Sequence, residues 1–569
     1  MNIGDFDTCV KFEHHTASSK IFSGQHCLIG LSALPNSTLD NDRNDLSLKH
    51  LANFLRASKL VVGNGFCMPA SCSVPKVVQF LNEQYLLKND LVALGGQCRD
   101  INDVQFEPLD YFAISLFSIF ALLITASTIY DIIKLKSKNP EPNKLLSSFS
   151  VYTNGYKLFD ITKSKSSSSI NCLHGLRGMS ILWIILGHRI TNQYPWGNTN
   201  DFIEFLTGKS IAAGIINAHT LAVDTFFVMG ALLMTWSTLR DCEKKQLNIP
   251  RMIWRRYIRY TPIYAALILS VVSFSKVLLK GPFYSDLSET CVKNWWLTLL
   301  HVQNYLQQKD MCLNHGWYLS ADFQLFIISP FIIFIIHKYG KKFLIIPALL
   351  FLSTIIYLIS ISIVYDIGMP APSANQHYLD FIYFPTHSRA GPWFVGIILG
   401  YYLFINQGRK IAISKIFNGF MWIFSLSVLF SVVFLQLGFS SATDEIPRGY
   451  HITFLAFHRN LWGVALCWII FACQNLKTGG IIRWFLSLPQ WQPISRMGLS
   501  MYLVGAVYQV MMILNQRVPL YLNVWQLVPI LLSDVFMIII LSTITYLAFE
   551  APNLVIEDYI YKKFKNIKK

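Results

Sequence analysis

Charged side chains are scarce in this sequence. Asp, Glu, Lys and Arg make up only 14% of the 569 residues, while hydrophobic residues make up 53%. Soluble domains usually hold about 25% charged residues. Together with a mean hydropathy of +0.40, the shortage of charge excludes a soluble globular protein and indicates a chain that crosses a membrane many times.

Several motifs of soluble enzymes are also missing. No spacing of Cys and His fits a zinc site, no glycine-rich loop fits a phosphate group, and no Gly-x-Ser-x-Gly turn is present. Nucleic-acid binding is disfavoured as well, although the net charge is +16. The basic residues lie in short loops between apolar segments, which is the usual pattern of cytosolic loops in membrane proteins.

The first residues, Met1 to Phe6, begin no hydrophobic run of the kind found in signal peptides. Residues 1–110 are nevertheless polar and rich in cysteine, which indicates disulfide bonds in an oxidising compartment. The cysteines are Cys9, Cys27, Cys67, Cys72 and Cys98. Because an odd number cannot pair internally, we expect the sequence to be N-terminally incomplete, lacking a signal peptide and a sixth cysteine. Asn36 opens a glycosylation sequon in the same region.

Eleven apolar segments are long enough to cross about 30 Å of hydrocarbon. They lie near residues 111–133, 176–194, 218–238, 258–279, 317–337, 342–365, 391–405, 415–438, 455–473, 497–514 and 523–549. We therefore expect an all-α polytopic membrane protein with about eleven transmembrane helices and an N-terminal extracytosolic cysteine-rich domain. Residues 134–170 are predicted to form a cytosolic linker, 171–552 a ten-helix membrane domain and 553–569 a basic tail.

Lys and Arg gather in alternate loops. The basic groups follow the first, third, fifth, seventh and ninth segments, and the tail ends in KKFKNIKK. All of them lie opposite the N-terminal domain, so this side and the C-terminus are predicted to face the cytosol. The N-terminal domain is then extracellular or lumenal, in the plasma membrane or the endoplasmic reticulum. Cys291 and Cys312 fall on the same outer side and are expected to form a disulfide.

Two ionisable residues share one stripe of the second apolar segment. Arg177 and His188 are eleven residues apart, which places them within about 20° on a helix and about 16 Å apart along its axis. Ionisable side chains at such a depth are functional candidates. His188 is a candidate general base, and Arg177 a candidate holder of an anionic donor from the cytosol. In the structural alternative, Arg177 extends to the lipid headgroups and His188 bonds a backbone carbonyl.

Intramembrane carboxylates are further candidates. Asp224 lies in the third segment, and Asp322 lies about two turns into the fifth, with Gln324 beside it. A buried carboxylate must be paired or protonated, so His188, His315 or an arginine is expected to partner Asp322. A structural polar contact between helices is the alternative.

Arginines are expected at both the outer and the cytosolic ends of the membrane domain. Arg389 precedes the seventh segment on its outer side. On the cytosolic side lie Arg251, Arg255, Arg256 and Arg259. This group suits phosphate binding, although the rule that positive loops face the cytosol also accounts for it.

Several of these stretches follow an order known from one protein family. The N-terminal patterns run over residues 4–9, 24–27 and 67–73, and the membrane motifs are CLHGLRG…GH at 172–188, VDTFFVMG at 223–230, WYLSADFQ at 317–324, RAGPWFVGIILGY at 389–401 and FEAP at 549–552. Over nearly the whole chain they resemble the acyltransferase 3 family, in its animal branch called nose resistant to fluoxetine.

The resemblance implies transfer of an acyl group from acyl-coenzyme A (acyl-CoA), on the cytosolic side, to a hydroxyl acceptor such as a lipid, a sterol or a glycan. In this scheme Arg177 positions the donor, His188 deprotonates the acceptor or a relay to it, and Asp322 orients or charge-balances the site. Further substrate-binding candidates are Asp224, Trp317, Tyr318, Gln324, Arg389, Arg255 and Arg259. The expected partners are membrane lipids, the donor and the acceptor, without a metal.

One position departs from the family. After Tyr502 and Leu503 the family usually has a histidine, whereas this chain has Gly505. If that imidazole serves the acceptor, this enzyme is altered in substrate or weakened; otherwise the position is merely structural. Two other functions therefore stay open. One is a transporter or uptake factor for lipids or small hydrophobic compounds, and the other is an inactive membrane scaffold whose cysteine domain binds partners.

Overall fold

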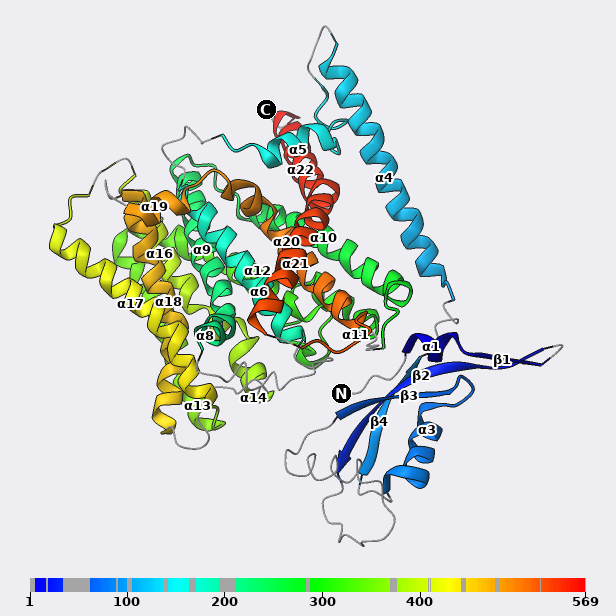
Figure 1. Ribbon diagram of the computed structural model, residues 1–569. Coiled ribbons are helices and arrows are strands. Elements are labelled where there is room, and N and C mark those ends of the chain that lie inside the picture. The colour runs from blue at the N-terminus through cyan, green and yellow to red at the C-terminus, as the bar shows by residue number, and fades with distance from the viewer. Residues whose placement is uncertain are drawn as a thin grey trace.

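The computed structural model describes most of the chain. The described residues are 6–16, 19–33, 62–87, 91–99, 105–137, 142–162, 170–193, 210–282, 287–368, 376–407, 409, 411–441, 447–475, 480–521 and 523–567. The sequon at Asn36 lies outside these ranges. Figure 1 shows a small N-terminal sheet domain at one end of a large helical body, with the C-terminus at the opposite end of that body.

The N-terminal domain is built around one long strand. Strand β2 (Ser19–Ala33) pairs antiparallel with β1 (Glu13–Thr16), β3 (Val62–Pro69) and β4 (Leu91–Arg99). Alternate side chains of β2, namely Cys27, Ile29 and Leu31, point to one face. There they are buried with Val77 and Leu81 of α3 (Val74–Leu81). A short helix, α1 (Phe6–Lys11), packs beside the sheet.

Two disulfides fasten this sheet. Cys9 bonds Cys67, and Cys27 bonds Cys98, which stands opposite it across the β2–β4 pair. Cys72 forms no disulfide with another cysteine of the described residues, so its pairing with a cysteine outside this sequence stays a prediction. It lies in the turn after β3, and the four other cysteines of the domain already bond one another.

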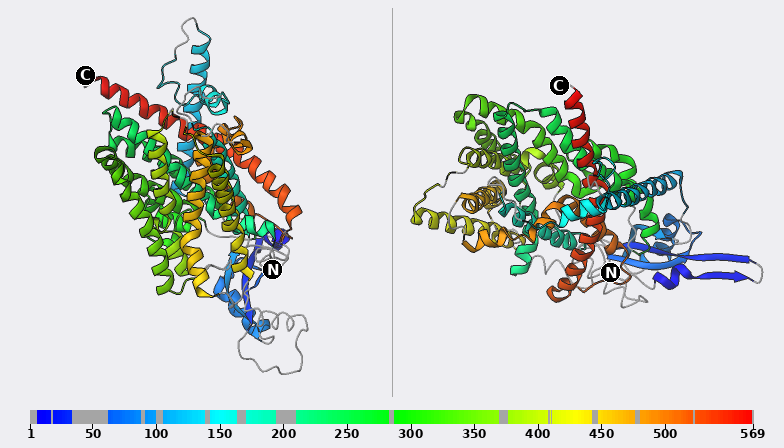
Figure 2. Two further views of the ribbon diagram at one scale, coloured as in Figure 1. Left: turned by 90° about the vertical axis from the view of Figure 1, so that its left-hand side faces the viewer. Right: turned by 90° about the horizontal axis from the view of Figure 1, so that it is seen from above.

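The helical body follows. Its helices are α4 (Pro108–Leu135), α5 (Val151–Phe159), α6 (Cys172–Gln193), α8 (Ile211–Asn217), α9 (Leu221–Glu243), α10 (Ile249–Leu278), α11 (Glu289–Leu299), α12 (Trp317–Tyr339), α13 (Ile345–Val364), α14 (Gln376–Tyr378), α15 (Thr386–Arg389), α16 (Gly391–Ile405), α17 (Lys415–Ser441), α18 (Arg448–Asn475), α19 (Gly480–Leu486), α20 (Trp491–Leu514), α21 (Val524–Thr545) and α22 (Ala551–Ile567). Helices α5, α19 and α22 gather at the end away from the sheet domain, in both Figure 1 and Figure 2.

The expected polytopic all-α architecture is confirmed. Within the described residues, nine helices are long and apolar enough to cross a membrane. The two other predicted spans are helices as well. Helix α16 is shorter, with 15 residues. Helix α6 has 22 residues, but polar side chains such as Arg177, His188 and Arg189 lower its hydropathy.

Helix α9 lies at the centre of the body and packs on α6, α12, α16 and α18. Its contact with α16 is close because glycine lines the interface. A β-carbon on Gly396 would lie 2.6 Å from the carbonyl oxygen of Val228. Small residues allow such close approach between membrane helices. A third disulfide, Cys291–Cys312, ties α11 to the loop before α12, as predicted.

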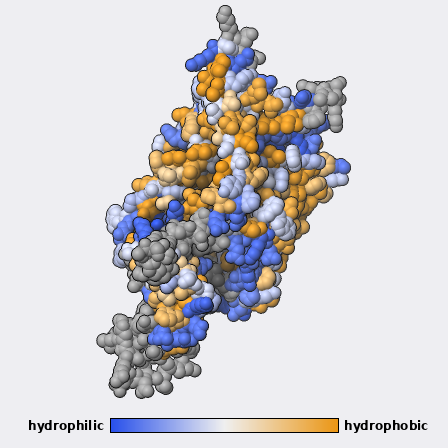
Figure 3. Space-filling model, turned by 90° about the vertical axis from the view of Figure 1, so that its right-hand side faces the viewer, coloured by the Kyte–Doolittle hydropathy of each residue, from blue (hydrophilic) through white to orange (hydrophobic). Residues whose placement is uncertain are grey.

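Helix α4 stands beside the body (Figure 2) and contacts it near both ends and, through Phe117 and Phe120, along its length. Near its start, Lys276 of α10 lies 2.5 Å from the carboxylate of Asp110. Near its end, buried Asp131 accepts hydrogen bonds from Ser150 (2.5 Å) and Thr153 (2.6 Å) at the start of α5. Figure 3, which views the protein from this side, shows mostly hydrophobic residues over the helices.

Candidate functional site

A cavity of about 290 Å³ lies between α6, α9, α10, α12 and α20. Polar side chains from all five helices line it: Arg177, Ser237, Arg256, Arg259, Tyr260, Tyr318, Asp322, Ser495 and Tyr502. Five of these, Arg177, Arg256, Arg259, Tyr318 and Asp322, were candidates from the sequence. Arg256 and Arg259 lie near the start of α10, the part of that helix that contacts α22.

The arginines of α10 are set by helix periodicity. Residues 256, 259 and 260 are spaced i, i+3 and i+4, so their side chains share one face. Nη2 of Arg256 lies 2.5 Å from Oδ2 of Asp322, and the hydroxyl of Tyr260 donates to the same oxygen at 2.9 Å. Of the partners considered for Asp322, the structure therefore selects an arginine. The substrate-binding candidates from the sequence included Arg255 and Arg259 but not Arg256, because only the packing of α10 on α12 shows which arginine faces Asp322.

Arg259 has its own carboxylate. Its Nε donates to Glu550 at 2.9 Å, and Ser500 donates to the other oxygen of Glu550 at 3.2 Å. Glu550 belongs to the motif at residues 549–552, for which no role was predicted from the sequence. Arg177, in contrast, makes no hydrogen bond or ion pair with any described residue. Three guanidinium groups thus share two carboxylates, and one positive charge at the cavity is left without a partner.

His188 lies farther along α6, toward the sheet-domain end. Its ring centre lies 6.2 Å from those of His219, His315 and Tyr502. The ring makes no hydrogen bond with the described residues. Tyr502 joins this cluster to the cavity, because it lines the cavity and its hydroxyl donates to the carbonyl of His315. The described residues hold no group of His, Cys, Asp or Glu suited to a metal ion.

Asp224 and Arg389 meet in a separate buried cluster. Oδ2 of Asp224 lies 3.0 Å from Nη1 of Arg459 and 3.6 Å from Nη1 of Arg389. The guanidinium of Arg389 also lies over the rings of Trp317 and Tyr383, at 4.8 and 4.5 Å. None of these residues lines the cavity. The arrangement is an interhelical ion cluster rather than an open binding surface.

Two other candidates also lie away from the cavity. Gln324 donates to the carbonyl of His301 (2.8 Å) and accepts from Thr386 (2.5 Å). Arg255 pairs with Asp558 of α22 at 2.8 Å. Some of the substrate-binding candidates therefore line the cavity, whereas the others form contacts between helices away from it.

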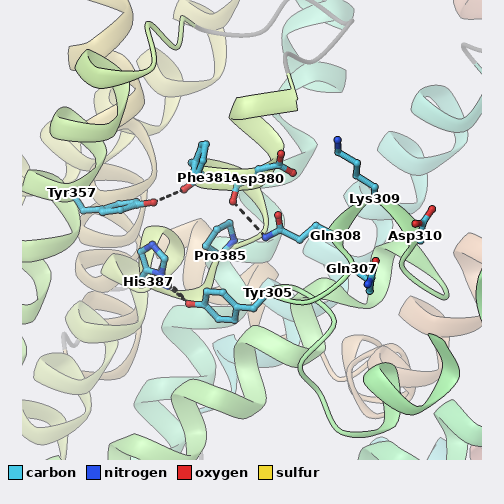
Figure 4. Close-up of a pocket in the computed structure, with 10 residues that line it drawn as sticks. All are labelled: Tyr305, Gln307, Gln308, Lys309, Asp310, Tyr357, Asp380, Phe381, Pro385 and His387. Carbon is cyan, nitrogen blue, oxygen red and sulfur yellow. Dashed lines mark hydrogen bonds between the residues drawn. The ribbon is translucent and has the colours of Figure 1, made fainter. Parts of the chain in front are cut away.

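A second, more open pocket of about 560 Å³ lies between the loop before α12 and the segment from α14 to α15. Figure 4 shows its floor, where the Tyr305 hydroxyl and Nδ1 of His387 are 2.9 Å apart and Tyr357 donates to the carbonyl of Phe381 at 3.1 Å. Burial lowers the pKa of His387, which favours the neutral ring. None of the sequence-predicted site residues lines this pocket.

Comparison with known proteins agrees with this architecture. The sequence model of the acyltransferase domain of the acyltransferase 3 family matches residues 170–547. This chain belongs to that family. The N-terminal domain of the nose resistant-to-fluoxetine proteins matches residues 1–81. The chain is thus a multi-pass membrane protein with an acyltransferase domain.

Individual relatives cover the chain to different extents. The chain is 27% identical to nose resistant to fluoxetine protein 6 of Caenorhabditis elegans, over 99% of this chain and 76% of that protein. It is 23% identical to regulator of hypoxia-inducible factor 1 of the same organism, over 42% and 52%. A Staphylococcus aureus (strain COL) protein named provisionally as an O-acetyltransferase is 26% identical over 42% and 36%. No solved structure matches.

Proposed function

We propose that this protein transfers an acyl group from acyl-CoA to a hydroxyl acceptor within the membrane. The observation that supports this most directly is the cavity of Arg177, Arg256 and Arg259, in which one guanidinium has no anionic partner. Coenzyme A carries phosphate groups, and guanidinium groups bind phosphate through paired hydrogen bonds. The basic residues of the sequence gather at the same end, which we take as the cytosolic side.

The volume of the cavity limits which part of the donor enters. About 290 Å³ is at the lower limit of the roughly 300–1,000 Å³ of sites for drug-sized ligands. We therefore place the thioester end of acyl-CoA in the cavity, beside Tyr318 and Tyr502, and its charged nucleotide at the arginines. Asp322 contributes indirectly, because it holds Arg256 in place.

In the proposed reaction His188 acts as a general base. It takes the proton of the acceptor hydroxyl, and the oxygen attacks the thioester carbon. The C–O bond of the ester forms, the C–S bond breaks, and the thiolate of coenzyme A receives the proton. A neutral imidazole is suited to this because its ring nitrogen without a hydrogen can accept the proton. The acceptor approaches His188 from the sheet-domain end, which is the extracytosolic side in this proposal.

Full-length protein in lipid nanodiscs tests the proposal. Acyl-CoA of several chain lengths is added, free thiol is measured, and acylated lipids, sterols and glycolipids are sought by mass spectrometry. We expect turnover by the wild type and a loss of about 10²-fold or more in His188→Gln, which is the usual contribution of a general base. Exposed His337 on α12 provides the control, and His337→Gln should react like the wild type. Equal turnover of His188→Gln and wild type contradicts the role of His188.

The same preparation separates the two alternatives. A transporter moves a fluorescent lipid across proteoliposomes without releasing coenzyme A. An inactive scaffold does neither. Lipid flux without thiol release, or neither activity with every acyl-CoA supplied, contradicts acyl transfer.

A further inference from the structure

The ring of His219 lies directly on α6 beside His188. His219 belongs to the short helical turn Ala218–Thr220 between α8 and α9. A β-carbon on Gly187 would lie 2.0 Å from Cγ of His219 and 2.1 Å from Cδ2. Only a glycine at position 187 leaves room for this imidazole. The backbone of α6 thus brings a second histidine next to His188, from a segment in which the sequence showed no motif for it.

The hydrogen bond of His219 determines its tautomer. Nδ1 lies 2.8 Å from the carbonyl oxygen of Ile216, which can only accept. Nδ1 therefore carries the hydrogen, and Nε2 is left with a free lone pair. Nε2 is bonded to Cδ2, so it lies on the edge of the ring that faces α6. It makes no hydrogen bond with any described residue.

A general base in an enzyme usually has a partner that fixes its tautomer and orientation. His219 has such a partner in the carbonyl of Ile216, whereas the ring of His188 has none among the described residues. The ring of His315, the third imidazole of the cluster, is held in a similar way by the backbone of Leu503, and its Nε2 is buried without a partner. His219 is the oriented ring that packs directly on the backbone of α6 next to His188.

We propose that His219 is a second proton-accepting residue of the acyl-transfer site. Its Nε2 accepts the hydrogen bond of the acceptor hydroxyl between His219 and His188. As the C–O bond forms and the C–S bond of the thioester breaks, the hydroxyl proton passes to one of the two imidazoles and from there to the thiolate of coenzyme A. The proposal rests on the acyl transfer proposed above and adds a residue to its chemistry.

The test is a substitution that removes Nε2 of His219 and keeps a hydrogen bond to the carbonyl of Ile216. In His219→Asn the side-chain amide nitrogen stands where Nδ1 stood and can still donate to Ile216, but the base is gone. We expect kcat to fall by about 10²-fold, as for loss of a general base. His458 gives a matched control, because it is buried and its Nδ1 lies 2.7 Å from the carbonyl of Phe454 in a different part of the body. His458→Asn should keep the kcat of the wild type.

Chemical rescue provides a second measurement that does not depend on how His219→Asn folds. Imidazole added to His219→Ala should restore part of kcat. Pyrazole has the same size but is a much weaker base, so it should not. Wild-type turnover in His219→Asn, or equal rescue by pyrazole and imidazole, overturns the role of His219 alone. Absence of turnover in the wild type overturns the acyl transfer itself.

Discussion

Nη2 of Arg256 lies 2.5 Å from Oδ2 of Asp322. The carboxylate of Asp322 is therefore occupied, because the same oxygen also accepts a hydrogen bond from Tyr260. It also neutralises Arg256. With Arg259 paired to Glu550, Arg177 is the cavity arginine that is free to bind an anion.

The first prediction concerns donor binding. Arg177→Gln should raise the KM for acyl-CoA by about 10-fold to 100-fold, since a hydrogen bond to a charged group contributes about 1.5–3 kcal/mol. Arg240→Gln is the control, because Arg240 is exposed at the end of α9 and pairs only loosely with Asp241. Steady-state kinetics with varied acyl-CoA measures both. An unchanged KM in Arg177→Gln means that the donor does not bind at this arginine.

A second prediction concerns the buried cluster at Asp224. This side chain is fully buried, as is that of Arg389, and Arg459 is nearly so. Asp224→Asn leaves two buried guanidinium groups without an anion, which should destabilise the protein by about 3–5 kcal/mol. A lower midpoint of thermal unfolding in detergent would show this. Asp241→Asn, at a partly exposed carboxylate, should leave the midpoint nearly unchanged; an equal effect of both changes speaks against the cluster.

The contact between α6 and His219 leads to a third prediction. The methyl group of Gly187→Ala overlaps the His219 ring, so the ring must move. Overpacking of this kind costs about 1–3 kcal/mol, and kcat should fall together with the unfolding midpoint. Gly419→Ala in α17 meets no atom within 4 Å and should be neutral. Full activity in Gly187→Ala would show that the position of the His219 ring does not matter.

Gly505 provides a fourth prediction. A β-carbon there would lie 3.3 Å from Cδ1 of Ile538 on α21, so residue 505 faces a packed helix. Gly505→His should therefore destabilise the protein by about 1–3 kcal/mol and should not raise turnover. If Gly505→His and Ile538→Ala are combined, the total cost should be smaller than the sum of the two. Faster turnover in Gly505→His would instead support a catalytic imidazole at this position.

The fifth prediction tests Cys72 and the orientation together. A maleimide that cannot cross membranes should label intact cells at one thiol, and Cys72→Ser should abolish the labelling. The other free cysteines, Cys172, Cys242, Cys467 and Cys473, are buried. Labelling only after reduction would show that Cys72 pairs with a cysteine outside this sequence. For protein in the plasma membrane, labelling only after permeabilisation would reverse the proposed orientation.

Hydropathy and charge were sufficient to predict the architecture. Each of the eleven predicted segments coincides with a helix, because apolar length is a local property of the sequence. Helix α6 was predicted as a span, but its hydropathy is too low for it to count among the nine apolar helices. Arg177, His188 and Arg189 lower it, and these polar residues are also what made the segment a functional candidate.

The partners of the site residues are not predictable in the same way. Asp322 has several cations within reach on a helix diagram, and only the packing of α10 on α12 selects Arg256. His219 comes from a turn without a periodic pattern, and its role depends on the close contact with Gly187. Conversely, Asp224 and Arg389 belong to the motifs at residues 223–230 and 389–401, but they form an ion pair with each other away from the cavity.

The two carboxylates of α4 differ in when their partners are synthesised. Asp131 bonds Ser150 and Thr153 of the linker, which is synthesised directly after α4. Asp110 accepts from the backbone N–H of Glu107 in its own turn, but its ion pair needs Lys276 of α10. The ion pair that fastens the start of α4 to the body therefore cannot form before α10 has been synthesised.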